Sequence, residues 1–227
     1  MRSTPSRWRL GVVLVVLALG ASLVASAALA RSGANRPARP QVQRINFVEV
    51  RGKNAAPVGT TCTNDFRLIH GGVTLGSATA SYTIDTSGSG LGGSAATAVQ
   101  AGFNTWHAAD SASPTVSGGG GSNTISWAPL GGTTVAVTGL SINPPTKTIL
   151  SFNMTFNSDL DWSATGEAGK FDVQDVATHE AGHVYGLDHV NPPKDAVMTM
   201  YPYVATGETL KSTLCDGDIL GLNTLYP

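Results

Sequence analysis

The sequence has few charged residues and very little cysteine. Charged residues make up 13% of its 227 positions, about half the usual share, and the formal net charge is −1. Such a weak charge gives no basis for binding nucleic acid or an anionic membrane surface. Apolar residues still form 41% of the chain, which excludes an intrinsically disordered protein. No internal repeat is visible, so the length favours one domain once the N-terminus is discounted.

The N-terminus has the pattern of a secretory signal peptide. Arg2, Arg7 and Arg9 precede an apolar run over residues 10–30 that ends in Ala-Leu-Ala. We predict cleavage after Ala30, giving a secreted protein without stable membrane association. Because the run is long enough to span a bilayer, an uncleaved anchor with the chain facing outside is the alternative. Cleavage removes three arginines and no acidic residue, which takes the formal charge from −1 to −4.

One stretch of eleven residues, HEAGHVYGLDH over 179–189, carries the chemistry. Helical residues four apart share a face, so His179 and His183 can bind one metal ion through neutral imidazoles. Glu180 lies one step round and can reach a water on that ion without ligating the ion. Gly186 can take the left-handed conformation that ends a helix, which lets His189 return as third ligand. Three ligands leave a fourth position for water, as in a catalytic zinc site.

The pattern H-E-x-x-H-x-x-G-x-x-H resembles that of the metzincin metallopeptidases, and of the matrixins in particular. Three of the five histidines fall inside it, which argues against a surface helix with coincidental histidines. The resemblance implies a monomeric zinc endopeptidase that acts on proteins or peptides, with Glu180 activating the zinc-bound water. A secreted binding module with a structural zinc site is the alternative.

Periodicity predicts a strand, a helix, four strands, the histidine helix and a final helix. The expected strands are 80–85, 114–117, 123–127, 133–140 and 148–157, and the expected helices are 95–109 after a Ser94 cap, a helix capped by Asp172, and 216–225.

This order is similar to the metzincin catalytic domain, an α+β fold. The resemblance implies a five-stranded twisted mixed sheet above an active-site helix, with a C-terminal helix. We expect residues 78–227 to form that domain. Residues 31–77 would form a lead-in, flexible over 31–45, and a β-rich flap. A substrate would then extend the sheet along an edge strand within 133–140.

Metzincins place a methionine in a tight turn beneath the three histidines. Met198 and Met200 both follow His189. Met200-Tyr201-Pro202 resembles the matrixin Met-Tyr-Pro, so we favour Met200, whereas Met198 has the spacing from His189 that is closer to the family.

Other positions depart from the matrixin pattern. Gly217 stands where matrixins carry the first of two aspartates, an acid that receives a new N-terminal ammonium on activation, so the resemblance does not extend to that switch. Thr155 replaces a zinc-binding histidine, so no second zinc is expected. A calcium ion held by Asp159 and Asp161 is left open, with solvated loop acids as the preferred interpretation.

The two cysteines, Cys62 and Cys215, are predicted to form a disulfide in an oxidising compartment. It would stabilise the fold by about 3–5 kcal/mol in the chain-entropy model. The alternative is that the Cys62 thiolate holds the zinc in a latent form, as Pro-Arg-Cys-Gly does in matrix-metalloproteinase pro-segments. The local sequence Thr-Cys-Thr-Asn does not resemble that segment.

Overall fold

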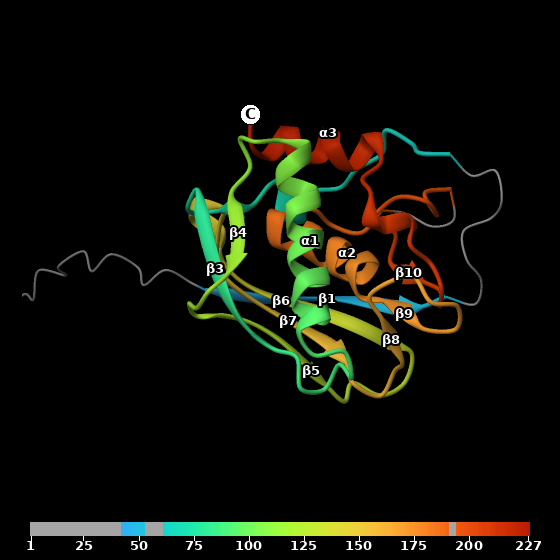
Figure 1. Ribbon diagram of the computed structural model, residues 1–227. Coiled ribbons are helices and arrows are strands. Elements are labelled where there is room, and N and C mark those ends of the chain that lie inside the picture. Colours follow the sequence, from blue (N-terminus) through green and yellow to red (C-terminus); the bar gives the residue numbers. More distant parts are fainter. Residues whose placement is uncertain (1–41, 53–60, 191–193) are drawn as a thin grey trace, which may run out of the picture. The chain divides into compact units, whose positions relative to one another are not determined.

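The computed structural model in Figure 1 describes residues 42–52, 61–190 and 194–227. The predicted signal peptide and residues 31–41 of the lead-in lie outside the described residues. No helix in the described part of the chain is long and apolar enough to cross a membrane.

The fold is built on one mixed sheet of eight strands in the order β10-β1-β6-β7-β5-β3-β4, with β2 paired to β7. β6 is antiparallel to both of its neighbours, and the strands from β7 to β4 run parallel. The α+β class and the mixed sheet are confirmed, although the sheet has eight strands where the resemblance implied five. Its strands are β1 (Gln43–Arg51), β2 (Thr74–Leu75), β3 (Thr79–Asp85), β4 (Thr115–Gly118), β5 (Asn123–Ala128), β6 (Thr134–Asn143), β7 (Thr148–Asn157) and β10 (Tyr203–Val204). A second sheet pairs β8 (Trp162–Ser163) with β9 (Phe171–Asp172).

Strand β1 departs from the expectation of a flexible lead-in that continues to residue 45. It begins at Gln43 and pairs with β6 from Gln43↔Ile142 to Val50↔Thr134. The expectation of a free sheet edge within 133–140 is therefore wrong, because β1 covers that side of β6. The expected β-rich flap agrees with the second half of β1, but its start at Gln43 and its place within the main sheet were missed, because a single strand is stabilised only by a partner far along the chain.

Three helices complete the fold: α1 (Gly93–Ala109), α2 (Val173–Tyr185) and α3 (Asp216–Leu225). Figure 1 shows α1 and α2 side by side against the sheet. The expected Ser94 cap is wrong: α1 begins at Gly93, and the Ser94 hydroxyl donates to the Leu91 carbonyl at 2.7 Å. Short 3-10 turns lie at η1 (Ile69–Gly71), η2 (Pro144–Thr146) and η3 (Leu210–Ser212).

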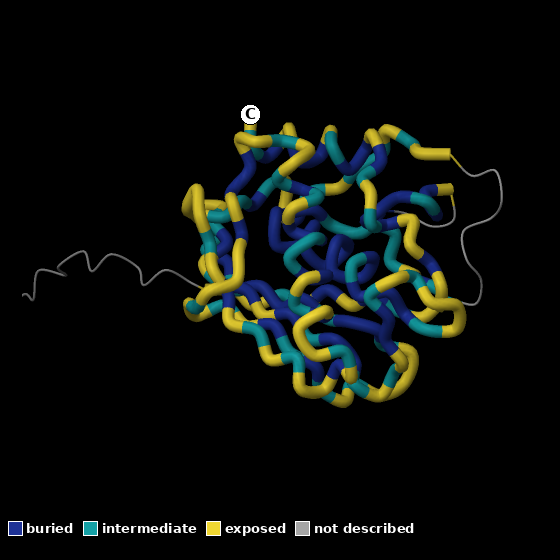
Figure 2. Tube along the Cα trace, viewed as in Figure 1, coloured by how far each residue is buried: buried dark blue, intermediate teal, exposed yellow. Residues whose placement is uncertain are grey.

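Helix α2 is the most deeply buried of the three helices, with Gln174 its one residue that is not fully buried. The helix backbones approach closely at Gly102, where an added Cβ would lie 2.8 Å from the Thr178 nitrogen. Beside this contact, Trp106 Nε1 donates to the Thr178 carbonyl at 2.7 Å. Figure 2 shows the buried chain around α2, with exposed segments at the periphery. The helix that carries the histidine motif is therefore buried around its whole circumference and held against α1.

Candidate metal centre

The two ends of α2 are set by residues that the sequence singled out. Asp172 caps the N-terminus, its Oδ1 accepting from the Asp175 nitrogen at 3.0 Å. Gly186 ends the helix with φ +105°, and its N–H is directed at the carbonyls of Gly182 and His183. A Cβ at Gly186 would overlap the Val73 carbonyl oxygen, so no larger residue fits there. Both predicted helix ends are confirmed.

The turn after Gly186 brings three imidazoles together. His189 Nε2 lies 3.1 Å from Nε2 of both His179 and His183. On the opposite side of each ring, His179 Nδ1 lies 2.7 Å from the Thr199 carbonyl oxygen and His183 Nδ1 lies 2.9 Å from that of Leu187. A carbonyl only accepts, so both Nδ1 atoms carry the proton and both Nε2 lone pairs face the shared centre. Two such lone pairs directed at one centre, with His189 Nε2 beside them, form a set of three imidazole nitrogens that suits zinc.

Burial keeps these imidazoles neutral, as metal ligands must be. It lowers the pKa of His179 and of His183 well below the ordinary histidine value. For His189, which is less deeply buried, burial lowers the pKa to about 4. The three residues are therefore ready to bind a metal without first losing a proton.

Glu180 is fully buried beside this cluster. Neither of its carboxylate oxygens has a hydrogen-bond partner among the described residues. Burial, and next the neighbouring Glu49, raises the pKa of its carboxyl well above the ordinary value. A buried carboxylate without partners is costly, which is typical of a group kept for chemistry.

Sequence reasoning missed two further charged residues at the site, Glu49 of β1 and Lys211 of η3. Both are buried, and Lys211 Nζ forms an ion pair with Glu49 Oε1. Glu49 Oε1 also lies 3.8 Å from His179 Nδ1. Burial raises the pKa of Glu49 to about 8, against the opposing effect of Lys211. The available signal was Glu49, an acid at an inward position of an alternating strand. Its pairing with Lys211 could not be predicted, because 162 positions separate the two residues.

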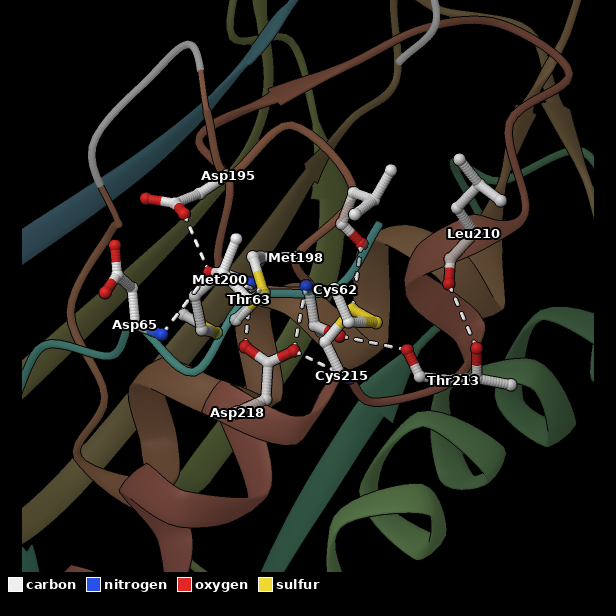
Figure 3. The surroundings of a disulfide bond; sticks show 12 residues. Cys62, Thr63, Asp65, Asp195, Met198, Met200, Leu210, Thr213, Cys215 and Asp218 are labelled. Atoms are coloured by element: carbon white, nitrogen blue, oxygen red, sulfur yellow. Dashed lines mark hydrogen bonds between the residues drawn. A yellow bond between two sulfur atoms is a disulfide. The ribbon is translucent and has the colours of Figure 1, made fainter. Parts of the chain in front are cut away.

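Met200, and not Met198, packs directly against the histidine helix. A Cβ added at Gly182 would overlap Met200 Sδ and lie 2.7 Å from Trp106. The Met198 sulfur instead lies 3.7 Å from the Thr63 hydroxyl, near the disulfide (Figure 3). This geometry supports the preference for Met200 as the methionine beneath the histidines.

Cys62 and Cys215 form a disulfide, with Cα atoms 5.3 Å apart (Figure 3). The segment that follows Cys62 crosses the start of α3, where the Gly217 nitrogen donates to the Thr63 carbonyl at 2.9 Å. A side chain at Gly217 would overlap the Asp65 carbonyl oxygen. The glycine that replaces the matrixin aspartate is thus required by a chain segment that fills that space.

The structure gives the calcium hypothesis no added support. Asp159 Oδ2 accepts a hydrogen bond from the Gly131 nitrogen at 3.3 Å. The groups of three potential ligands among the described residues include neither Asp159 nor Asp161. Calcium binding stays a prediction.

The part of the chain that contains the histidine helix is similar to a known family. Residues 140–227 match the family model of the matrixins, peptidase family M10. The chain is also 38% identical over 77 residues to Metalloendoproteinase 1 of Glycine max, an overlap of 31% of this chain and 24% of that protein. It is 32% identical over 77 residues to Metalloendoproteinase 2-MMP of Arabidopsis thaliana, an overlap of 31% of this chain and 19% of that protein.

The chain therefore spans a quarter or less of the length of these relatives. The family match covers α2, the convergent histidines, the Met200 turn and α3. Together with the mixed sheet that packs on α2, this match supports a matrixin-like metzincin peptidase.

Proposed function

We propose that the protein is a secreted zinc-dependent endopeptidase that hydrolyses protein or peptide substrates. One observation carries this proposal: three Nε2 atoms converge beside the carboxyl group of Glu180, which has no hydrogen-bond partner in the described part of the chain. In the proposed enzyme, His179, His183 and His189 hold one zinc ion, and Glu180 is the general base. The names of the two plant relatives, both metalloendoproteinases, support the same activity.

Each residue has a distinct part in the proposed reaction. Bound zinc supplies a Lewis acid that polarises the scissile carbonyl and favours deprotonation of water near neutral pH. Glu180 accepts the proton of the attacking water and then transfers it to the leaving amine nitrogen. The carbonyl groups of Thr199 and Leu187 hold two imidazoles in the ligand tautomer. Met200 packs against this helix at Gly182.

The test compares the full chain with two variants and one control substitution, measuring turnover of casein and bound zinc in each. Glu180→Ala should abolish turnover and keep about one zinc per chain, whereas His183→Ala should lose both. Glu167→Ala, which removes an exposed acid from the loop before α2, is the matched control and should leave both unchanged. Turnover that survives Glu180→Ala contradicts the proposal.

We further propose export of a monomer with cleavage after Ala30. The arginines and the apolar run of the first 30 residues support export. A disulfide, which is typical of oxidising compartments, supports it as well. N-terminal sequencing of the extracellular protein tests this, with Arg31 expected as the first residue. A chain recovered in membranes with residues 1–30 intact would favour the anchored alternative.

A further inference from the structure

Strand β1 covers the candidate metal centre. It lies between β6 and β10, antiparallel to the first and parallel to the second. The Phe47 ring stacks on the His183 ring, with centroids 4.2 Å apart and planes inclined by 17°. It also meets the His189 ring edge-on at 6.1 Å. Any peptide that extended the sheet along β6 to reach Glu180 would have to take the place of β1.

Beyond Phe47, β1 inserts a charged side chain into the protein. Alternation along the strand directs Phe47 and Glu49 inward, both buried, while Val48 between them is 39% exposed. Glu49 Oε1 pairs with Lys211 Nζ, and among the described residues it is the one carboxylate within 4.0 Å of that ammonium. The backbone around Val48 therefore crosses the histidine cluster, and the side chain of Glu49 points into the protein interior, where it meets Lys211.

The other two acids near Lys211, Asp175 and Glu208, form no ion pair with it among the described residues, although Asp175 Oδ2 has no hydrogen-bond partner there. Lys211 Nζ also donates to the Tyr203 carbonyl at 2.8 Å. Asp175 Oδ1 accepts from the backbone nitrogens of Lys211 and Ser212, at 2.6 and 3.2 Å. Glu208 Oε2 accepts from the Ala205 nitrogen at 3.0 Å. A peptide that displaced β1 with an apolar side chain would leave the buried ammonium without its ion-pair partner, which is strongly unfavourable.

We propose that the substrate groove is the space alongside β6 that β1 now fills. This groove selects an extended peptide with an acidic side chain directly after the bond presented to Glu180, and residues 43–51 are its intramolecular occupant. Lys211 is the specificity-determining residue. This inference deepens the proposed function, because it names the substrate class of the same site. It also accounts for the burial of the Glu180 carboxylate, since β1 seals the groove until it is displaced.

The experiment measures binding and needs no turnover, so its result is independent of whether the chain hydrolyses peptides. All proteins are full chains loaded with zinc, with Glu180→Ala added to prevent cleavage. The probes are fluorescent nine-residue peptides that copy residues 43–51, with Glu, Gln or Lys at the position of Glu49. Fluorescence anisotropy gives their affinities, and hydrogen exchange reports whether the β1 and β6 amides are protected.

A variant in which β1 is displaced should show which peptide the groove prefers. Glu49→Lys places an ammonium against Lys211, so the β1 amides should lose their protection from hydrogen exchange. The Glu peptide should bind this variant at least 10-fold more tightly than it binds the chain that keeps Glu49. In that opened chain, the Gln peptide should bind at least about 30-fold more weakly than the Glu peptide, since breaking a buried ion pair carries a large penalty.

A charge swap provides the control. Glu49→Lys with Lys211→Glu should restore protection of β1 and exclude all three peptides. Lys211→Glu alone should open the groove and reverse the preference towards the Lys peptide. If Lys211→Glu does not fold, Lys211→Gln combined with Glu49→Lys serves instead and should bind the Glu and Gln peptides within about 3-fold.

Two outcomes overturn the inference. If the Glu49→Lys chain folds with β1 still protected and binds no peptide, β1 is a permanent strand of the sheet. If the opened chain binds the Glu and Gln peptides within 3-fold of each other, Lys211 does not select an acid. Failure of casein turnover by the zinc-loaded Glu49→Lys chain with Glu180 intact, in which β1 no longer seals the groove, would instead contradict the proposed function and leave these binding results as they stand.

Discussion

His179 Nδ1 lies 2.7 Å from the carbonyl oxygen of Thr199, the residue that precedes Met200. The turn that packs against α2 therefore also orients the first histidine of the cluster. Asp218 of α3 holds this turn, its two carboxylate oxygens accepting from the nitrogens of Thr199 at 3.0 Å and Met200 at 3.4 Å. The C-terminal helix is thus connected to the candidate metal centre by two successive hydrogen bonds.

Asp218→Ala is expected to weaken both folding and zinc binding. The carboxylate also accepts from the Cys215 nitrogen at 2.9 Å, so three backbone N–H groups would lose their acceptor. We expect the free energy of unfolding to fall by about 3 kcal/mol. Zinc affinity should fall roughly 10-fold or more, because His179 loses its fixed orientation. Urea unfolding and competition with a chromophoric chelator measure the two effects.

Asp216→Ala is the matched control for this prediction, since Asp216 is an exposed acid in the first turn of the same helix. It should cost less than about 1 kcal/mol and leave zinc affinity unchanged. Wild-type zinc affinity in Asp218→Ala, despite lost stability, would mean that the turn does not orient His179.

Gly182→Ala tests the close packing of Met200 beneath the histidine helix. An added Cβ would overlap Met200 Sδ and approach Trp106 to 2.7 Å in a region without free space. We expect a loss of about 1–3 kcal/mol in the free energy of unfolding, despite the better helix propensity of alanine. Thermal and urea unfolding give the value.

Gly93→Ala serves as the comparison for that substitution, because nothing lies within 4 Å of a Cβ at this helical glycine. It should stabilise the protein by about 0.4–1 kcal/mol, through reduced freedom of the unfolded chain. Equal effects of the two substitutions would show that Met200 does not constrain Gly182.

Local patterns predicted the histidine helix because its determinants are short-range. His179 and His183 lie one turn apart, Asp172 caps from the adjacent position, and Gly186 ends the helix by its own backbone conformation. Each of these features depends on residues within a few positions of one another. The strands β3 to β7 were found for the same reason, because alternation of buried and exposed residues is local.

The closed groove could not be predicted in this way. β1 is held by pairing with β6, about 90 positions away, and by Glu49 with Lys211, 162 positions away. The sequence around β1 contains no pattern that indicates β6 or Lys211 as its partner. The resemblance to the matrixins implied an open edge at β6, and only the assembled sheet reveals that residues 43–51 occupy it.

Removal of metal should lower stability through the histidine cluster alone. Zinc that binds only the folded chain adds about 2.7 kcal/mol when its free concentration is 100 times the dissociation constant. A chelator should therefore lower the unfolding midpoint of the full chain, and added zinc should restore it. The His183→Ala chain should show no response to either reagent. A midpoint that falls equally in both chains would point to a different metal site.

Loss of the disulfide should lower stability without disturbing the metal centre. Cys62 and Cys215 are 153 positions apart, which corresponds to about 5 kcal/mol in the chain-entropy model. We expect the chain with both Cys62→Ser and Cys215→Ser to lose about 3–5 kcal/mol in urea unfolding. Zinc affinity should change less than 3-fold, since α2 and the turn at Gly186 position the histidines independently of the bridge.

A reductant provides the control for that prediction, because it should reproduce the loss in the wild-type chain and have no effect on the double variant. Wild-type stability of the double variant would contradict it. In that case, the segment after Cys62 must be held by its remaining contacts. These include the hydrogen bond from the Gly217 nitrogen to the Thr63 carbonyl, the hydrogen bond from the Thr63 hydroxyl to Asp195 at 2.8 Å (Figure 3), and the ion pair between Lys194 and Asp65. Thr63→Val in the double-serine chain would then separate the contributions of the two hydrogen bonds, since it removes the hydroxyl and leaves the backbone bond intact.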